Sequence, residues 1–167
     1  MSMLDSNIYR AIEKILYHYF DIKHEIKAKE EEIMNCQKYG FKIDLGNAGY
    51  YSDPTATMAI KLCSKELEIM RKWIQVIDAA KEKFKGTGKG RLLEMRYFEE
   101  LATDYICQKL FIERRTFYHW RDDIVVYIAS LAVKYELYDP EKERIKIPAF
   151  LNTKSLKKCG TNKAIKS

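Results

Sequence analysis

Two long stretches of the chain repeat apolar residues in alternating steps of three and four, and this spacing constrains the fold more than any other feature. The first stretch runs from Asn7 to about Gln37, and the second from Pro54 to about Lys85. Such an alternation places the apolar side chains on one narrow stripe of a helix, as in coiled coils. We therefore expect two long helices, each packed against another helix along its stripe. The stripes are Ile12, Ile15, Tyr19, Ile22, Ile26, Ile33 and Cys36 in the first stretch, and Ile60, Cys63, Leu67, Met70, Ile74, Ile77 and Phe84 in the second.

Turn-forming residues separate these two helices and end the second one. Segment 38–52 contains three glycines and four aromatic residues, which is typical of a loop or short hairpin with some packing of its own. Asp53 can cap the second helix, and Pro54 suits its first position. The segment Gly86–Gly90 follows that helix and lacks the spacing of a phosphate-binding loop. Its glycines predict a flexible joint.

Two helices of similar length joined by a folded loop form either an antiparallel helical hairpin or a dimerising coiled coil. The spacing does not choose between these two arrangements. Our working prediction is a long antiparallel, coiled-coil-like helical hairpin over residues 1–85, with an aromatic loop at 38–52 and a glycine-rich joint at 86–90. In either arrangement the helices would serve as a scaffold that sets the oligomeric state.

The segment Leu92–Leu137 has a different pattern, made of short amphipathic helices. A leading helix is expected over Arg91–Glu99, a second over Thr103–Leu110, and a third from about Glu113 to Tyr135, with a tight turn between the last two. The side chains expected to point inward are Ile106, Leu110, Ile112, Phe117, Trp120 and Ile124. This order predicts a helix-turn-helix domain over residues 91–138, so the whole chain is expected to be all-α.

The outward face of the third helix carries side chain types with which proteins read DNA. Arginine can bind guanine through two hydrogen bonds, and His, Tyr and Thr can reach bases or phosphates. Cations in the first turn of a helix oppose the helix dipole, which favours a use outside the helix for Arg114 and Arg115. The alternative is an ordinary amphipathic helix with a solvated arginine face. The candidate DNA-binding residues are Arg114, Arg115, Thr116, Tyr118, His119 and Arg121, with Lys109 of the preceding helix as a phosphate contact.

The distribution of charge supports a polyanionic partner, with one exception. The net charge is +6, and residues 139–167 hold eight Lys or Arg against three Asp or Glu. Such a basic tail either contacts phosphates without reading sequence or is simply solvated. Asp122 and Asp123 in the third helix would repel phosphate. We therefore expect the middle of that helix to face away from the DNA backbone or toward protein.

Other classes of function lack their motifs in this chain. Cys36, Cys63, Cys107 and Cys159 are far apart and form no C-x-x-C pair, which favours reduced thiols over disulfides or a zinc site. No metalloprotease, serine hydrolase or Cys–His pattern is present, so we predict no enzymatic activity, no metal and no cofactor. The sequence has neither a run of about 20 apolar residues nor a signal-peptide pattern, and a cytoplasmic location is expected.

The order of these parts resembles that in known families. The string LLEMRYFEE, with the helix-turn-helix that follows it, resembles region 4 of bacterial sigma factors, which reads promoter elements. The string YYSDPTATMAIKL, between a long helix and that module, resembles phage-encoded transcriptional regulators of the RinA and ArpU type. The resemblance covers about Ile8 to Tyr138. At the turn this chain has Leu110-Phe111-Ile112-Glu113, where family members tend to have leucine-glycine-isoleucine-serine.

The resemblance implies sequence-specific binding of double-stranded DNA by a phage or prophage transcriptional regulator that activates late genes. It also implies that the third helix is the recognition helix. The hairpin would form a homodimer or contact RNA polymerase. The alternatives are a protein-interaction module that docks on RNA polymerase or on a packaging protein, and a small-terminase-like protein that binds DNA for packaging.

Overall fold

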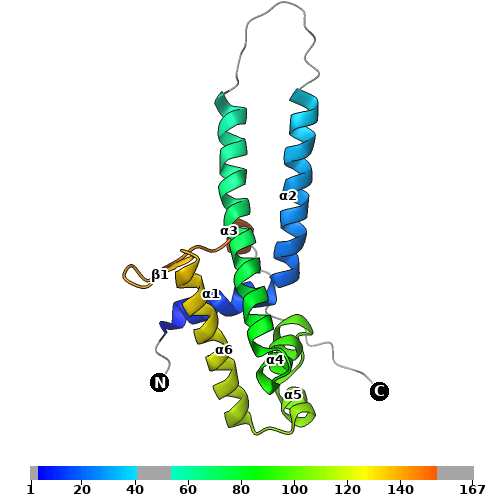
Figure 1. Cartoon of the computed structure of the whole chain (residues 1–167), viewed down its shortest axis with the longest axis vertical. Coiled ribbons are helices and arrows are strands. Elements are labelled where there is room, and N and C mark those ends of the chain that lie inside the picture. Colours follow the sequence, from blue (N-terminus) through cyan, green and yellow to red (C-terminus); the bar gives the residue numbers. More distant parts are fainter. Residues whose placement is uncertain (1–3, 41–53, 154–167) are drawn as a thin grey trace, which may run out of the picture.

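The chain folds mostly into helices, which confirms the all-α prediction at this level (Figure 1). The structure is a computed structural model and describes residues 4–40 and 54–153, without the side chains of residues 33, 36–40, 54–63 and 153. In chain order the elements are α1 (Ser6–Tyr17), α2 (Tyr19–Gly40), α3 (Pro54–Phe84), α4 (Gly88–Leu93), the π-helical turn η1 (Glu94–Phe98), α5 (Thr103–Leu110), α6 (Arg114–Lys134), the strands β1 (Tyr138–Asp139) and β2 (Arg144–Ile145), and α7 (Ala149–Thr153).

Helices α2 and α3 run side by side in opposite directions and project from the rest of the molecule (Figure 1). Near the base of this pair, the hydroxyl of Tyr19 donates a hydrogen bond to Asp78 at 2.6 Å. Farther out, the ion pair between Lys29 and Glu66 joins the two helices at 3.1 Å. The predicted stripe residues Ile33, Cys36, Ile60 and Cys63, and the predicted cap Asp53, lie outside the described side chains.

The prediction of one continuous helix over Asn7–Gln37 is wrong, because the helix breaks at His18. The backbone there leaves helical geometry, at φ −99° and ψ 20°, and α2 begins at the next residue. Helix α1 packs against α6 and η1, whereas α2 packs against α3. A straight helix could not bury Ile12 against α6 and η1 and also bury Ile22 against α3. The break lets both apolar residues reach the core, where both are fully buried.

Helix α3 is buried on two sides rather than along one stripe. Leu67, Met70 and Ile77 are buried as predicted. Trp73, Val76 and Ala80 are also fully buried, although they lie outside the predicted stripe. The reason is that α2 covers one side of α3, while α4 and α6 cover another. Helix α3 is therefore the central element that connects the projecting pair to the rest of the fold.

The predicted joint at Gly86–Gly90 is instead a turn followed by the tightly packed start of α4. Thr87 caps this helix, since its hydroxyl oxygen accepts a hydrogen bond from the backbone N–H of Gly90 at 3.2 Å. A Cβ atom at Gly88 would lie 2.5 Å from ring atoms of Trp120, and one at Gly90 would collide with the backbone carbonyl of Phe84. These glycines therefore permit close packing between α3, α4 and α6. The buried core is continuous across the predicted domain boundary.

The first part of the predicted basic tail is folded. Strands β1 and β2 pair in antiparallel register, with Tyr138 opposite Ile145. The indole N–H of Trp73 donates a hydrogen bond to the carbonyl oxygen of Lys146 at 2.7 Å, and Leu151 of α7 is fully buried. The segment 138–153 is thus anchored to α3. Residues 154–167 lie outside the described part of the chain.

Candidate nucleic-acid interface

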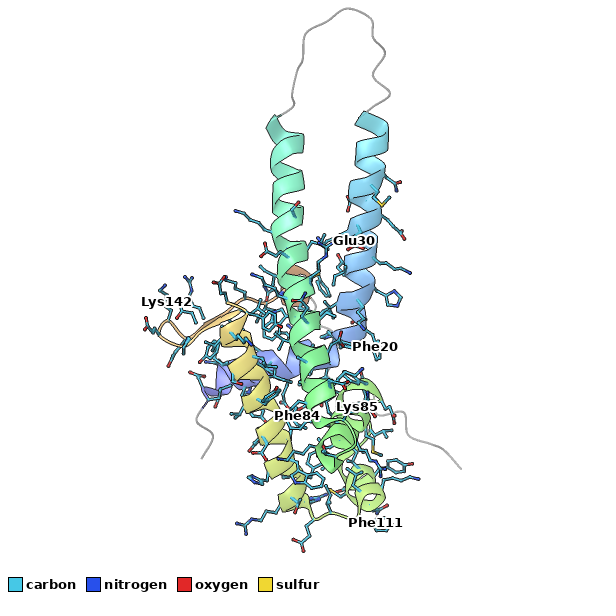
Figure 2. The ribbon with its side chains drawn as sticks, in the orientation of Figure 1. Phe20, Glu30, Phe84, Lys85, Phe111 and Lys142 are labelled. Carbon is cyan, nitrogen blue, oxygen red and sulfur yellow. The ribbon has the colours of Figure 1, made fainter. Side chains whose placement is uncertain are left out.

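A tight turn joins α5 and α6 at one end of the molecule. Helix α5 ends at Leu110, and Phe111 adopts left-handed backbone angles of φ 53° and ψ 46°. The backbone N–H of Ile112 then donates a hydrogen bond to the carbonyl oxygen of Cys107 at 3.0 Å, which completes a Schellman motif. Glycine usually takes the left-handed position because it has no Cβ. Here Phe111 takes it, with its side chain at the tip of the molecule and 95% exposed (Figure 2).

A small apolar core fixes how α6 is rotated against α5. Phe117 and Ile124 of α6 are buried, as are Ile106 and Cys107 of α5. Trp120 is half-buried and packs on Gly88. These inward positions agree with those predicted from the sequence. The rotation that they impose determines which side chains of α6 face solvent.

The first turns of α6 bring three of the predicted DNA-binding side chains to one exposed surface. Arg115, Tyr118 and His119 are all exposed, and Thr116 beside them is half-buried. Within the described residues, the Arg115 guanidinium forms no ion pair. The imidazole of His119 lies 3.8 Å from the carboxylate of Asp123, which is the edge of ion-pair range. We call Arg115, Tyr118 and His119 the outer face of α6.

Arg114 is also exposed, but its charge has a partner within the fold. Its Nε and Nη2 atoms lie 2.9 Å and 2.5 Å from one carboxylate oxygen of Asp104, in the first turn of α5. The hydrogen bond that Arg114 donates to Asp104, and the negative charge of that carboxylate, raise the pKa of Arg114. This pair compensates a cation that would otherwise oppose the dipole of α6. The dipole argument for an external role therefore applies to Arg115 rather than to Arg114.

Arg121 does not join the outer face. Its side chain is only 24% exposed and lies between the rings of Tyr9 and Tyr118, at 5.2 Å and 5.0 Å from their centroids. Its Nε atom is 3.9 Å from Glu13 of α1. The guanidinium of Arg121 is directed into contacts with α1, and its predicted role as a direct DNA contact stays a prediction.

The two acidic residues in the middle of α6 are engaged by other elements. Asp122 accepts a hydrogen bond from the Tyr9 hydroxyl at 2.6 Å, and Asp123 accepts one from the Lys89 ammonium at 2.8 Å. Burial and the hydrogen bond to Asp122 raise the pKa of Tyr9, so the donor keeps its proton. The middle of α6 therefore faces protein, which is one of the two arrangements expected from the sequence. These contacts reduce the repulsion that the carboxylates would exert on phosphate.

Lys109 lies on α5, apart from the outer face of α6. It is exposed, and its Nζ atom is 5.8 Å from the centroid of the Tyr105 ring. Sequence reasoning did not identify Tyr9, Lys89 or Asp104 as parts of this region. Tyr9 and Lys89 contact α6 over long sequence separations, and such contacts leave no periodic signal. The pairing of Asp104 with Arg114 could have been suspected from two opposite charges at the starts of adjacent helices.

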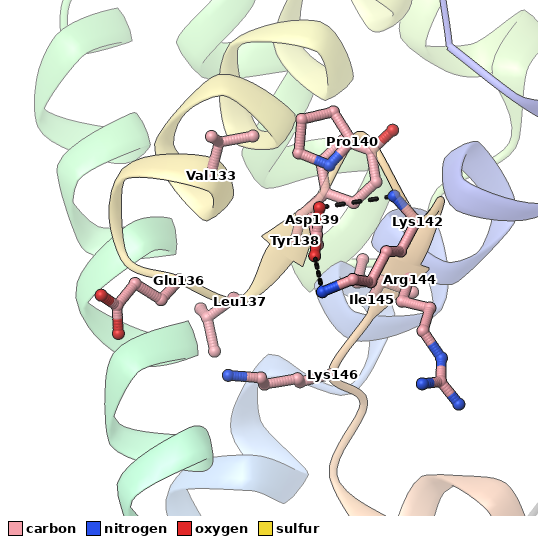
Figure 3. Close-up of a pocket in the computed structure, with 10 residues that line it drawn as sticks. All are labelled: Val133, Glu136, Leu137, Tyr138, Asp139, Pro140, Lys142, Arg144, Ile145 and Lys146. Atoms are coloured by element: carbon pink, nitrogen blue, oxygen red, sulfur yellow. Dashed lines mark hydrogen bonds and ion pairs between the residues drawn. The ribbon is translucent and has the colours of Figure 1, made fainter.

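A groove of about 630 Å³ lies at the opposite end of α6, beside the β1–β2 hairpin (Figure 3). Lys142, Arg144 and Lys146 line it together with Glu136 and Asp139. The Asp139 carboxylate forms an ion pair with Lys142 at 3.3 Å. It also accepts hydrogen bonds from the backbone N–H groups of Glu141 and Lys142 in the hairpin turn. The charges are mixed, with three cations against two carboxylates and Lys142 already paired with Asp139, so we do not assign this groove to nucleic acid.

Comparisons of the chain with protein-family models, with curated proteins and with solved structures find no match. The resemblance to phage regulators therefore stays a prediction. Among the described residues, no group of His, Cys, Asp and Glu side chains has an arrangement that could hold a metal ion. The helices within residues 4–40 and 54–153 include none with the length and apolar composition that a bilayer crossing requires.

Proposed function

We propose that this protein binds double-stranded DNA sequence-specifically as a transcriptional regulator of a phage or prophage, and that it activates late genes. In this proposal α5 and α6 form the helix-turn-helix, and the first turns of α6 enter the major groove. One observation carries the proposal: the outer face of α6 presents Arg115, which has no ion-pair partner among the described residues, next to the exposed Tyr118 and His119.

The dimensions and chemistry of α6 suit this role. An α-helix with its side chains is about 10–12 Å across, and the major groove of B-DNA is about 12 Å wide. Arg115 would bind a guanine through two hydrogen bonds, while Tyr118 and His119 would contact neighbouring bases or phosphates. Thr116 and Arg114 would contact the backbone, the latter by exchanging Asp104 for a phosphate. Lys109 and the basic residues after 153 would add phosphate contacts.

The projecting pair of α2 and α3 would form the predicted antiparallel hairpin and act away from the DNA. It lies at the opposite end of the molecule from the α5–α6 turn (Figure 1). We assign it to contacts with a second copy of the chain or with RNA polymerase. A dimer would place two recognition helices at a fixed spacing, so its binding site would consist of two half-sites about one helical turn of DNA, or a multiple of it, apart.

The test is selection of bound duplexes from a random DNA pool at about physiological salt, followed by binding measurements with Arg115→Ala. An enriched motif is expected, with a loss of roughly 1–3 kcal/mol for the variant and relaxed specificity at one base pair. Arg71→Ala is the matched control, because Arg71 is an exposed arginine of α3 that pairs with Glu30. Salt-sensitive binding without an enriched motif would instead indicate a small-terminase-like packaging role.

A second candidate function is docking on another protein, such as RNA polymerase or a packaging protein. The observation that favours it is Phe111, a large apolar side chain that is 95% exposed at the tip of the α5–α6 turn. Docking through apolar contacts would depend weakly on salt, whereas each phosphate contact to duplex DNA lowers the slope of log K against log salt by about 0.9. Absence of duplex binding together with salt-insensitive binding to polymerase would favour this candidate.

A further inference from the structure

Arg121 is placed between two aromatic rings that belong to different helices. Its guanidinium carbon lies 5.2 Å from the centroid of the Tyr9 ring in α1 and 5.0 Å from that of the Tyr118 ring in α6. A planar cation attracts the faces of aromatic rings, and arginine does so more often than lysine. The sequence separates Tyr9 from the other two residues by more than a hundred positions. The three side chains nevertheless form one stack.

Carboxylates around Arg121 compensate its charge. Glu13 of α1 lies 3.9 Å from its Nε atom, and Asp122 lies 3.4 Å from its Nη2 atom. Glu13 also accepts a hydrogen bond from the buried Tyr97 hydroxyl of η1 at 2.9 Å. The Arg121 side chain is mostly buried, so both its position and its charge are committed to the protein interior rather than to an external phosphate.

Tyr118 is the exposed member of the stack. About 45% of this residue is accessible to solvent, and it lies on the outer face of α6. The guanidinium of Arg121 contacts its ring, and Phe117 packs against it edge to face at a centroid distance of 5.4 Å. Two contacts thus restrict the orientation of a side chain that is still open to a partner. A side chain ordered before binding loses less entropy when it forms an interface.

We propose that Arg121 is a positioning residue, which orients Tyr118 for DNA without touching DNA and makes α1 part of the DNA-reading unit. This inference rests on the proposed function. It assigns Arg121 a different role from that of Arg115, although the two arginines lie on the same helix. It also extends the reading unit beyond the helix-turn-helix predicted over residues 91–138, because Tyr9 supplies the other side of the stack.

The first experiment compares Arg121→Lys with Arg115→Lys in the full chain, using the selected duplex and a scrambled duplex. Lysine keeps the charge but lacks a planar face that can stack. We expect Arg121→Lys to reduce the ratio of specific to non-specific affinity roughly tenfold, with unchanged affinity for the scrambled duplex and an unchanged salt slope. Arg121→Gln removes the charge as well, and a salt slope that falls in magnitude by about 0.9 in this variant would show a phosphate contact and overturn the inference. An unchanged specificity ratio would overturn it as well.

A second measurement needs no DNA and separates the failure of this inference from the failure of the proposed function. The ring resonances of Tyr118 are followed by NMR in the free protein. Arg121→Lys and Tyr9→Leu, which each remove one side of the stack, should shift them. Tyr9→Phe keeps the ring but removes the hydrogen bond to Asp122 and should leave them nearly unchanged. If the wild-type protein binds no duplex, the proposed function is wrong. The inference that Arg121 serves DNA reading is then wrong too. Unchanged Tyr118 resonances in Arg121→Lys would overturn the positioning role by themselves.

Tyr9→Leu also guards against a folding defect in the arginine variant. It leaves Arg121 in place and acts from α1, outside the helix-turn-helix. The inference expects it to lower the specificity ratio in the same direction as Arg121→Lys, at equal helical content by circular dichroism. A Tyr9→Leu protein that is folded and retains full specificity would show that α1 is not part of the DNA-reading unit.

Discussion

Lys89 and Asp123 are tied to each other, since the Lys89 ammonium donates a hydrogen bond to the Asp123 carboxylate across 2.8 Å. Lys89 lies at the start of α4 and Asp123 in the middle of α6, so this pair joins the glycine-rich helix start to the proposed recognition helix. Without Lys89, the carboxylate would present an uncompensated negative charge near the proposed DNA surface. Lys89 thus has an electrostatic role in addition to holding the two helices together.

Loss of this pair should weaken DNA binding. We expect Lys89→Met to lower affinity several-fold at low salt and less at high salt, because salt screens the repulsion between Asp123 and phosphate. Adding Asp123→Asn to the same chain should restore most of the affinity. The matched control is Lys85→Met, which removes one positive charge from an exposed lysine paired with Glu82. Fluorescence anisotropy at two salt concentrations measures the effect, and an equal loss in both lysine variants would show that only net charge matters.

The parts of the fold that depend on local pattern could be predicted from the sequence. Helix α5 has the predicted bounds Thr103–Leu110, and Phe117 and Ile124 of α6 point inward as expected. Short amphipathic helices joined by a tight turn have a strong periodic signal, because each must bury one face against its neighbour. The same periodic signal predicted a helix from Pro54 to about Lys85, and α3 ends at Phe84.

The break at His18 could not be predicted in this way. The apolar spacing continues across it, from Ile15 to Tyr19 and Ile22, and all three side chains are buried. What differs is the partner of each half, since α1 packs on α6 and α2 packs on α3. Periodicity records which face of a helix is buried and not which element covers it. The packing of the glycine-rich segment is set in a similar way, because a Cβ atom at Gly88 would meet the ring of Trp120 in α6.

The position of the Arg121 side chain is also set by distant residues. Sequence reasoning placed it with Arg114 and Arg115 because all three fall outside the apolar stripe of α6. The hydrogen bond between Tyr9 and Asp122, which brings α1 alongside, spans 113 positions. A contact between residues so far apart in the sequence does not change the local pattern of apolar residues. Of the three predicted arginines, the structure therefore leaves Arg115 on the outer face of α6, pairs Arg114 with Asp104 and directs Arg121 toward α1.

Phe111 should be replaceable by glycine with a gain in stability. Its backbone is left-handed, at φ 53°, and its side chain is 95% exposed, so little packing would be lost. We expect Phe111→Gly to raise the free energy of unfolding by about 0.5–1 kcal/mol, because glycine adopts this geometry without a steric cost. Urea denaturation with an unchanged m-value measures it. Gln108→Gly, at an exposed position within α5, is the control and should lose about 1 kcal/mol. A lower free energy of unfolding in both variants would show that the left-handed backbone of Phe111 is not strained.

Added methyl groups at the start of α4 should destabilise the fold. A Cβ atom at Gly88 would meet the Trp120 ring at 2.5 Å, and one at Gly90 would meet backbone atoms of Phe84. Overpacking of this kind costs about 1–3 kcal/mol. We expect Gly90→Ala to be the more harmful, because a backbone carbonyl yields less readily than a side chain. Gly88→Ala should also change the Trp120 fluorescence, and Lys85→Ala, at an exposed site nearby, should change neither stability nor emission. Equal stability of all three variants would show that α4 is loosely packed.

Stability should fall at alkaline pH through Tyr97. Burial and the nearby Glu13 carboxylate raise the pKa of Tyr97 above the ordinary tyrosine value of 10.0. Above that pH the unfolded chain releases a proton that the folded protein keeps, so the free energy of unfolding decreases as pH rises. Below that pH both states hold the proton, and the contribution of Tyr97 is fully present. The pKa of Tyr9 is raised in the same direction, first by burial and then by its hydrogen bond to Asp122.

Urea denaturation between about pH 8 and pH 11 measures this dependence, since the window begins below the ordinary tyrosine pKa and ends above it. We expect Tyr97→Phe to lower stability at neutral pH, because Glu13 loses the donor that lies 2.9 Å away, and to flatten the decline above pH 10. Tyr105→Phe, on the exposed side of α5, controls for the removal of one hydroxyl and should leave the decline as it is in the wild type. A decline of the same steepness in Tyr97→Phe would mean that other tyrosines dominate it. Tyr9→Phe, whose hydroxyl is held at 2.6 Å by Asp122, would then be the variant that flattens the curve.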